Sequence, residues 1–269
     1  MPDANAARFT GSIPVFYDQQ LGPIIFSEYA ENLAHRVALF SPQRVLETAA
    51  GTGILTRLLR DHLDESSRIT ATDLNPPMLA VAKAKFRPSE TVTFAAADAT
   101  DLPFTAGAFD AVVCQFGVMF YPDKVKSYRE VRRVLVQGGR YLFNVWDSHA
   151  HNPFGRVAYE TVCGFFPADP PQFHRVPFAY HDIDEIKESL IAADFHDIRI
   201  AVVGIAKKVP DVAAFARGLI QGTPIVDQIS ARCTVPAERV VDTLENSLRS
   251  LLGAADQKLQ MQAIIFDAA

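Results

Sequence analysis

Cysteine is scarce in this chain, and long apolar runs are missing. Three cysteines stand far apart among the 269 residues, at Cys114, Cys163 and Cys233, a pattern that fits neither a zinc-binding spacing nor an even set of disulfides. No apolar run approaches the roughly 20 residues of a membrane span. The first twelve residues lack the basic start and apolar stretch of a signal peptide. We therefore expect a cytoplasmic protein without a membrane span.

Dense clusters of lysine and arginine are also missing. The formal net charge is −5, whereas a protein that neutralises many phosphates usually carries a basic patch. The most basic stretch, residues 124–133, has apolar residues every three to four positions, which is typical of a solvated helix face. We therefore expect a small molecule as the partner and no nucleic acid. The oligomeric state stays open between a monomer and a homodimer.

Short β-type runs alternate with helical patterns between about residues 44 and 146. Asn75 followed by Pro76 predicts a helix N-cap, and Gly138-Gly139 predicts the end of a later helix. Alternating strands and helices indicate a parallel sheet with right-handed crossovers, an α/β fold. The expected strands are residues 44–50, 68–74, 91–97, 109–116 and 140–146, and the expected helices between them are residues 54–63, 76–86 and 124–135.

The flanking parts of the chain predict added helices and two further strands. Residues 1–40 should form an N-terminal helical segment, and residues 41–269 the main domain. Residues 196–203 and 261–268 should be the last two strands, paired antiparallel. Two segments inserted into the main domain should form a cap, one rich in proline and aromatic residues at about 147–182 and one mostly helical at about 204–258.

The stretch VLETAAGTG, residues 45–53, ends a strand in an acid and continues in small residues before a helix. Glycines at such a turn let a ligand approach the backbone, and the helix N-terminus presents free N–H groups. A tight turn without a ligand has the same local pattern. Two more acids follow at the ends of the next two strands, Asp73 and Asp98, where ligands of open α/β sheets bind.

Five stretches resemble, in order and spacing, the motifs of class I S-adenosylmethionine (SAM)-dependent methyltransferases, most of all the ubiquinone/menaquinone-biosynthesis C-methyltransferases. They are VLETAAGTG, TDLNPPML, ADATDLPF, FDAVVCQFGVMFYPD and EVRRVLVQGGRYLF, within residues 44–146. The resemblance implies a Rossmann-like, seven-stranded, mostly parallel sheet with helices on both faces and an antiparallel last strand. It also implies SAM as cofactor and S-adenosylhomocysteine (SAH) as product.

The resemblance further implies where the cofactor lies. Asp73 would bind the ribose. One departure from the family pattern is Ala49, which replaces the usual first glycine; alanine is tolerable there if this residue keeps a β or right-handed helical conformation. The methionine part would lie against Glu47, Ala49, Gly51, Gly53 and Gln115, and the adenine against Leu74, Met78, Asp98 and Ala99.

The sequence offers several candidates for a catalytic base. Methyl transfer from a sulfonium needs a base only if the acceptor must first lose a proton. Tyr17, Tyr121, His149 and His151 are the candidates, with His174 and His181 as further histidines. For each histidine a polar loop residue is the alternative. The His149–His151 pair has no acids at ligand spacing beyond Asp147, so we expect no metal site.

The sequence therefore predicts methyl transfer from SAM to a small, hydrophobic acceptor. One alternative is a methyltransferase-like protein that binds SAM without transfer. The other is an NAD-binding oxidoreductase, which would require a G-x-G-x-x-G turn that this chain does not have.

Overall fold

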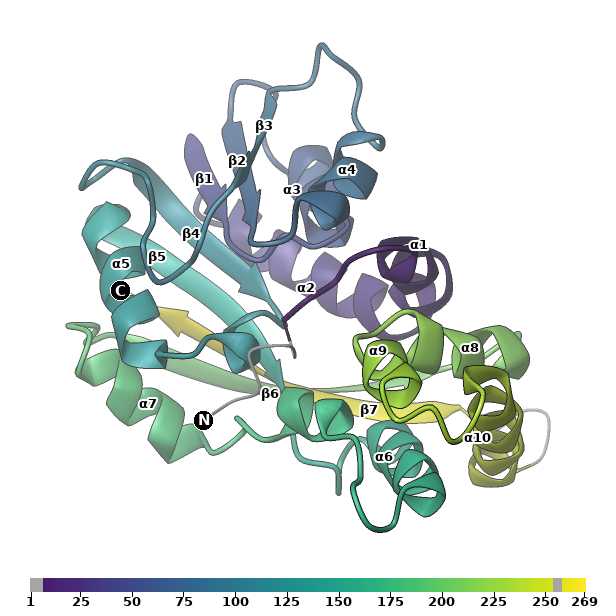
Figure 1. Cartoon of the computed structure of the whole chain (residues 1–269). Helices are drawn as coiled ribbons and strands as arrows, with labels where there is room; N and C mark the ends of the chain where they lie inside the picture. Colours follow the sequence, from purple (N-terminus) through teal and green to yellow (C-terminus); the bar gives the residue numbers. More distant parts are fainter. Residues whose placement is uncertain (1–6, 254–257) are drawn as a thin grey trace.

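A computed structural model describes residues 7–253 and 258–269. The first six residues of the expected N-terminal segment and residues 254–257 of the second cap segment lie outside this range. In the described chain one sheet has the strand order β3-β2-β1-β4-β5-β7-β6 (Figure 1). The strands are β1 (Arg44–Glu47), β2 (Arg68–Asp73), β3 (Val92–Ala96), β4 (Phe109–Gln115), β5 (Leu135–Trp146), β6 (Ile198–Lys207) and β7 (Leu259–Ala268).

The pairing of the strands confirms the predicted fold class. β1 to β5 pair in parallel, and β7 runs antiparallel to both β5 and β6. The parallel register places Glu47 beside Ala71 of β2 and Val113 of β4. All five parallel strands therefore end at the same edge of the sheet, the edge at which such folds bind ligands.

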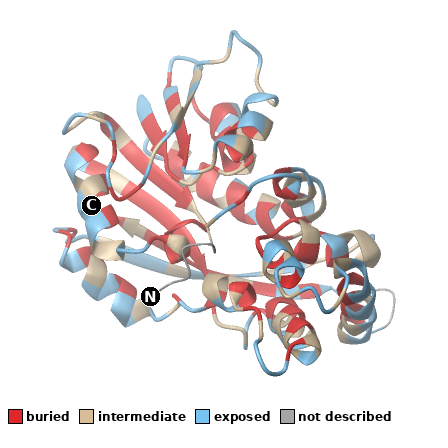
Figure 2. Cartoon of the chain, viewed as in Figure 1, coloured by how far each residue is buried: buried red, intermediate tan, exposed pale blue. Residues whose placement is uncertain are grey.

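Alternate residues of the central strands pack against different helices, as the two-residue period of a strand requires. Ala111 and Val113 of β4 share a core with α2 (Ser27–Ala38) and α3 (Ile54–His62), whereas Val112 and Cys114 share the other core with α5 (Lys124–Val134). α4 (Pro76–Lys83) packs through Leu79 on Ala71, and α7 (Ile183–Ile191) packs on α5. Figure 2 shows the resulting buried sheet between helices with exposed outer faces.

Helices from both flanks of the chain gather beside this sheet. The N-terminal part forms α1 (Ile13–Phe16) and the π-helix η1 (Tyr17–Phe26). η1 packs on α8 (Val212–Gln221), which packs on α10 (Ala237–Leu252), and α10 also contacts α6 (Pro153–Phe165) (Figure 1). The other elements of this group are η2 (Val118–Phe120), η3 (Phe173–Phe178) and α9 (Ile225–Ser230). Of these elements η1, η2, α6, η3 and α8 contribute residues to the wall of the apolar cavity described below.

The predicted helix end at Gly138-Gly139 was wrong. Helix α5 already ends at Val134, and both glycines lie inside β5. They lie where the β4–β5 register shifts, and Gly138 has a φ of +75°, so glycine serves a bulge here. Strand bounds differ as well, since β5 starts at Leu135 and β6 extends to Lys207, beyond the predicted ranges.

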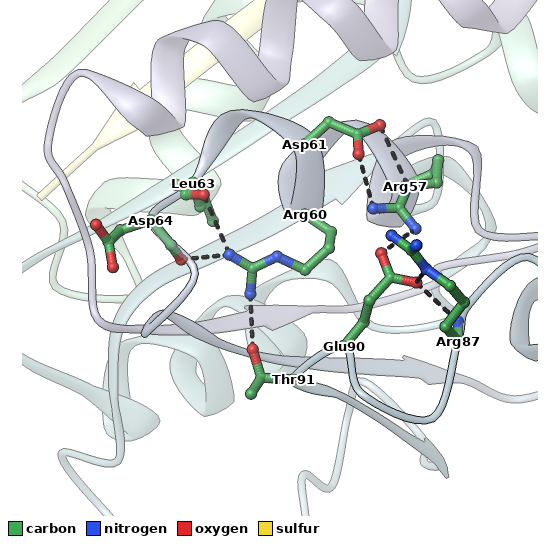
Figure 3. A network of polar contacts seen from close by, with 8 residues as sticks. All are labelled: Arg57, Arg60, Asp61, Leu63, Asp64, Arg87, Glu90 and Thr91. Carbon is green, nitrogen blue, oxygen red and sulfur yellow. Dashed lines mark hydrogen bonds and ion pairs between the residues drawn. The ribbon is translucent and has the colours of Figure 1, made fainter.

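The edge opposite the ligand-binding edge is held by a buried arginine (Figure 3). The guanidinium of Arg60, at the end of α3, donates to the carbonyl oxygens of Leu63, Asp64 and Ser67 and to the hydroxyl of Thr91. These bonds link the end of α3 to carbonyl groups of the turn that follows it. They fix α3 relative to the starts of β2 and β3.

Candidate functional site

The turn between β1 and α3 has three residues in the left-handed region. Ala49, Gly51 and Gly53 have φ values of +51°, +57° and +77°. Ala49 therefore does not keep the β or right-handed helical conformation in which alanine would be tolerated without strain. A left-handed conformation costs a non-glycine residue about 1–2 kcal/mol, so the surrounding structure holds Ala49 in a strained turn. Glycine at this position would carry no such strain.

Glu47, the last residue of β1, is 1% exposed. Burial raises the pKa of its carboxyl group to about 8; the nearby charge of Asp73 adds to this rise, and the hydroxyl of Thr56 opposes it. Its Oε2 atom is buried and has no hydrogen-bond partner among the described residues. A buried carboxylate without a partner is costly, so this group is suited to a cationic ligand.

Glu47 lies in the wall of a small polar cavity together with Tyr17, Thr52 and Gln115. Thr52 Oγ1 and Gln115 Oε1 are also buried without a partner in the described chain. Three residues of one cavity wall thus each carry an unpaired oxygen atom, and such atoms are complementary to a group with several N–H donors, such as the ammonium of an amino acid. The rest of the wall is formed by Ala49, Ala50, Gly51, Ile54 and Leu55.

Asp73, at the end of β2, braces the turn. Its Oδ2 accepts from the backbone N–H of Gly51 at 2.9 Å, and its Oδ1 accepts from the backbone N–H of Asn75 at 2.7 Å. Burial raises the pKa of Asp73, while these N–H groups act in the opposite direction. The carboxylate is therefore held in place, at the edge where a ribose would lie.

Asn75 occupies the N-cap position of α4, but its side chain makes no capping bond. Its Oδ1 accepts from the backbone N–H of Phe9 at 3.1 Å, and its Nδ2 donates to the carbonyl of Ala7 at 2.9 Å and to Asp73 Oδ1 at 3.2 Å. The prediction of a side-chain cap was therefore wrong. This side chain instead ties the N-terminal segment to the cofactor edge.

We expect Asp73→Ala to lower both SAM affinity and stability. It removes the carboxylate that would accept from the ribose hydroxyls, each charge-assisted bond being worth about 1.5–3 kcal/mol, and it releases the N–H groups of Gly51 and Asn75. Affinity should fall roughly tenfold to a few hundredfold, with a stability loss of about 1–3 kcal/mol.

Asn75→Ala is the matched control for Asp73→Ala. It should cost stability by freeing residues 7–9, yet change SAM affinity much less. Urea titrations and calorimetry with SAM separate the two variants. Normal SAM binding by Asp73→Ala would contradict a ribose role.

Asp73 and five other predicted cofactor residues lie outside the wall of the polar cavity. An added Cβ on Gly53 would stand 2.8 Å from Ala82 Cβ of α4, so close helix packing explains this glycine. Asp98 Oδ1 accepts from the N–H and the hydroxyl of Thr100, both at 2.8 Å, which is a local turn. Leu74 is 58% exposed, whereas Met78 and Ala99 are buried.

A second, apolar cavity adjoins the polar one, and Tyr17 lies in the wall of both. No Asp, Glu, Lys or Arg belongs to its wall among the described residues. The Tyr17 ring stacks on Phe26 at 4.8 Å between centroids, and burial raises its pKa. The wall includes Phe9, Phe26, Phe116, Phe120, Trp146, Phe154, Phe173, His174, Phe178, Leu219 and Thr223.

The other catalytic candidates lie elsewhere. The Tyr121 hydroxyl donates to Thr48 Oγ1 at 3.1 Å and lies 3.3 Å from Cys114 Sγ, a buried network beneath the turn. His149 Nε2 bonds to the carbonyl of His174, and exposed His151 lies 3.4 Å from an oxygen of Asp147. Neither Tyr121 nor these two histidines line either cavity. Only Tyr17 of the four is at the boundary between the cavities.

His174 and His181, the two further histidines, occupy different places relative to the cavities. His174 lies in the wall of the apolar cavity, whereas His181 lines neither cavity. Two absences hold for the described residues, 7–253 and 258–269. No group of three or more His, Cys, Asp or Glu is placed to hold a metal ion there. No helix in that part of the chain is long and apolar enough to cross a membrane.

Comparison with known proteins identifies the domain. Residues 46–143 match the family model described as a methyltransferase domain. The chain is 39% identical over 130 residues to the demethylmenaquinone methyltransferase of Thermus thermophilus, an alignment of 46% of this chain and 58% of the relative. The chain contains a class I SAM-dependent methyltransferase domain. It resembles the ubiquinone/menaquinone-biosynthesis methyltransferases.

Two further matches of the methyltransferase domain extend over more of the chain. A malonyl-[acyl-carrier protein] O-methyltransferase of Geobacter sulfurreducens is 27% identical over 80% of this chain and 79% of the relative. Phosphoethanolamine N-methyltransferase 2 of Haemonchus contortus, solved with phosphomonomethylethanolamine and SAH, has a TM-score of 0.61 at 19% identity, covering 98% of this chain and 59% of that one. The latter likeness shows the shared fold. The chain spans about half the length of the quinone-biosynthesis relatives it matches.

Proposed function

We propose that this protein transfers the methyl group of SAM to a small, neutral, apolar acceptor. The observation that carries the proposal is the shared wall: Tyr17 lines both the polar cavity at Glu47 and the aromatic cavity beside it. A methyl donor in the first cavity and an acceptor in the second would meet at this side chain. Holding both reactants in line supplies much of the rate of such a displacement.

The unpaired oxygen atoms of residues around the polar cavity support the place of the methyl donor in this proposal. Glu47, Thr52 and Gln115 would hold the ammonium group of the methionine part through their unpaired oxygens. Asp73 would accept from the ribose, and Leu74, Met78, Asp98 and Ala99 would surround the adenine. SAM supplies the methyl group on a positively charged sulfur. The protein positions the two reactants, and the aromatic wall keeps water from the acceptor.

The apolar cavity favours a neutral acceptor over the charged molecules of two relatives. A malonyl group and phosphomonomethylethanolamine both carry negative charge, and their recognition calls for Lys, Arg or helix N-termini. The described wall of the cavity contains no charged side chain. Burying an anion there without a partner would cost several kcal/mol. We therefore favour an uncharged acceptor.

We expect the purified protein to bind SAM and SAH, and not NAD, in calorimetric titrations. Incubation with methyl-labelled SAM and small-molecule extracts should produce compounds heavier by one methyl group, found by untargeted mass spectrometry. Tyr17→Phe keeps the ring and tests whether the hydroxyl takes part in transfer. Saturable NAD binding without SAM binding would exclude the proposal, and SAM binding without any methylated product would favour a cofactor-binding protein that lacks transfer.

Two properties of the whole protein remain predictions. The cytoplasmic location rests on three cysteines that are all free in the structure. The choice between a monomer and a homodimer is open, and light scattering of the purified protein would decide it.

A further inference from the structure

His174 is a buried polar side chain in the wall of the apolar cavity. It belongs to η3 and is 4% exposed. Its Nε2 lies 3.1 Å from the carbonyl oxygen of Leu219. A carbonyl oxygen only accepts hydrogen bonds, so Nε2 must carry the proton in this contact. The other ring nitrogen, Nδ1, is then a hydrogen-bond acceptor.

This hydrogen-bond acceptor is unpaired among the described residues. Nδ1 of His174 is buried and makes no hydrogen bond with any described residue. Burial lowers the pKa of the ring to about 4, although the carbonyl groups of Leu219 and Ala158 oppose this effect. The ring is therefore neutral near pH 7. A buried acceptor left unpaired costs about 1–3 kcal/mol, so a ligand that pairs with it would recover this free energy.

The other polar groups of the cavity wall leave His174 a distinct role. The Thr223 hydroxyl already donates to the carbonyl of Leu219 at 2.9 Å. The Tyr17 hydroxyl lies at the boundary with the polar cavity. His174 is therefore the buried polar side chain of this wall with a ring nitrogen that has no hydrogen-bond partner among the described residues, beside rings such as those of Phe173, Phe178 and Trp146.

We infer that the methyl acceptor is a neutral molecule with a hydroxyl or N–H group. This group donates a hydrogen bond to Nδ1 of His174. This inference rests on the proposed function, since it assigns the apolar cavity to the acceptor. His174 is a specificity-determining residue in this scheme. A methyl acceptor of the same shape that lacks this donor group would leave Nδ1 unpaired. It would therefore bind less tightly than the molecule that carries the group.

Trp146 is the only tryptophan of the chain and lies in the wall of this cavity, so its fluorescence reports binding directly. The probes are phenol and toluene, which differ by a hydroxyl in place of a methyl group. Each is titrated into the SAH-saturated protein with excitation at 295 nm. His174→Leu removes both nitrogens. His174→Gln places an amide where Nε2 lies, keeping a donor for the carbonyl of Leu219 while removing the Nδ1 acceptor.

We expect both His174 variants to raise the ratio of the phenol to the toluene dissociation constant roughly tenfold. Thr223→Val, which removes a hydroxyl already bonded to Leu219, should leave the ratio within about twofold. An unchanged ratio in both His174 variants would overturn the role of His174, as would a change confined to Tyr17→Phe. If neither probe perturbed Trp146 fluorescence, the cavity would not be a ligand site, and this inference would fail together with the acceptor part of the proposed function. Failure of SAM binding in calorimetry would instead overturn the proposed function, while the phenol-to-toluene ratio would still show whether His174 pairs with a donor group in this cavity.

Discussion

Replacing Glu47 with glutamine should weaken SAM binding by roughly 100-fold or more while making the ligand-free protein more stable near neutral pH. Glu47 is buried, and its Oε2 has no partner until a ligand arrives. Removing one partner of a buried ion pair typically costs about 3–5 kcal/mol, which sets the expected loss of affinity. The isosteric amide keeps the shape of the cavity and removes only the charge.

The opposite effect on stability follows from the raised pKa. In the unfolded chain Glu47 loses its proton near pH 4.5, whereas in the folded protein burial raises its pKa to about 8. Between these values the folded state binds more protons than the unfolded state, so the stability contributed by this group falls as pH rises. The full contribution is present below about pH 4.5, and the loss is complete above about pH 8. Glutamine does not titrate and escapes this loss.

Urea titrations between pH 4 and 9 measure the stability effect. The difference in unfolding free energy between Glu47→Gln and the natural protein should grow across the window from pH 4.5 to 8. Glu188→Gln, which makes the same change on an exposed face of α7, is the matched control. A pH-independent difference for Glu47→Gln would mean that the buried carboxyl does not carry the raised pKa.

Cofactor binding should release a proton for the same reason. The SAM ammonium group favours the ionised carboxylate, so binding lowers the pKa of Glu47, and affinity should rise with pH up to about 8. Calorimetry in two buffers of different ionisation enthalpy counts the protons. Release near pH 7 should disappear in Glu47→Gln.

The sheet was predictable because its signals are local and repeated. β4 alternates between two cores, and α5 shows the three-to-four-residue period of a helix with one buried face. The error at Gly138-Gly139 also has a local cause. A helix end and a β-bulge both favour glycine with positive φ, so the dipeptide alone does not distinguish them.

The polar half of the site was also accessible from the sequence, since Glu47, Ala49, Gly51 and Gln115 lie in or beside one ordered motif block and line one cavity. For the acceptor half the sequence indicated separate segments and single candidates, Tyr17 and His174 among them, but not that they share one cavity. Tyr17 and His174 are 157 positions apart and meet the same cavity only because η1 and η3 pack beside the sheet. Likewise, the bond from the Phe9 N–H to Asn75 spans 66 positions, and a local capping pattern at Asn75 gives no sign of it.

Gly117→Ala should be strongly destabilising, and the strained Ala49 should be part of the cause. Gly117 has a φ of −103°, which alanine adopts readily, so any cost is steric. A Cβ atom there would lie 2.5 Å from Ala49 Cβ and 2.6 Å from Cys114 Sγ. Overpacking of this kind costs about 1–3 kcal/mol, occasionally more. The displaced turn would also lower SAM affinity, by roughly tenfold or more, because Ala49 lines the polar cavity.

Ala49→Gly provides the test of this cause. Alone it should stabilise by up to about 1 kcal/mol, since glycine relieves the left-handed strain at φ +51°. Combined with Gly117→Ala it should recover a large part of both losses, because one of the two close contacts is gone. A double-mutant cycle on urea-unfolding free energies should therefore give a coupling of about 1 kcal/mol or more. Gly164→Ala, where an added Cβ meets nothing within 4 Å, is the control and should not destabilise. Strictly additive effects of the two substitutions would show that Ala49 and Gly117 do not press on each other, and that Cys114 alone sets the cost.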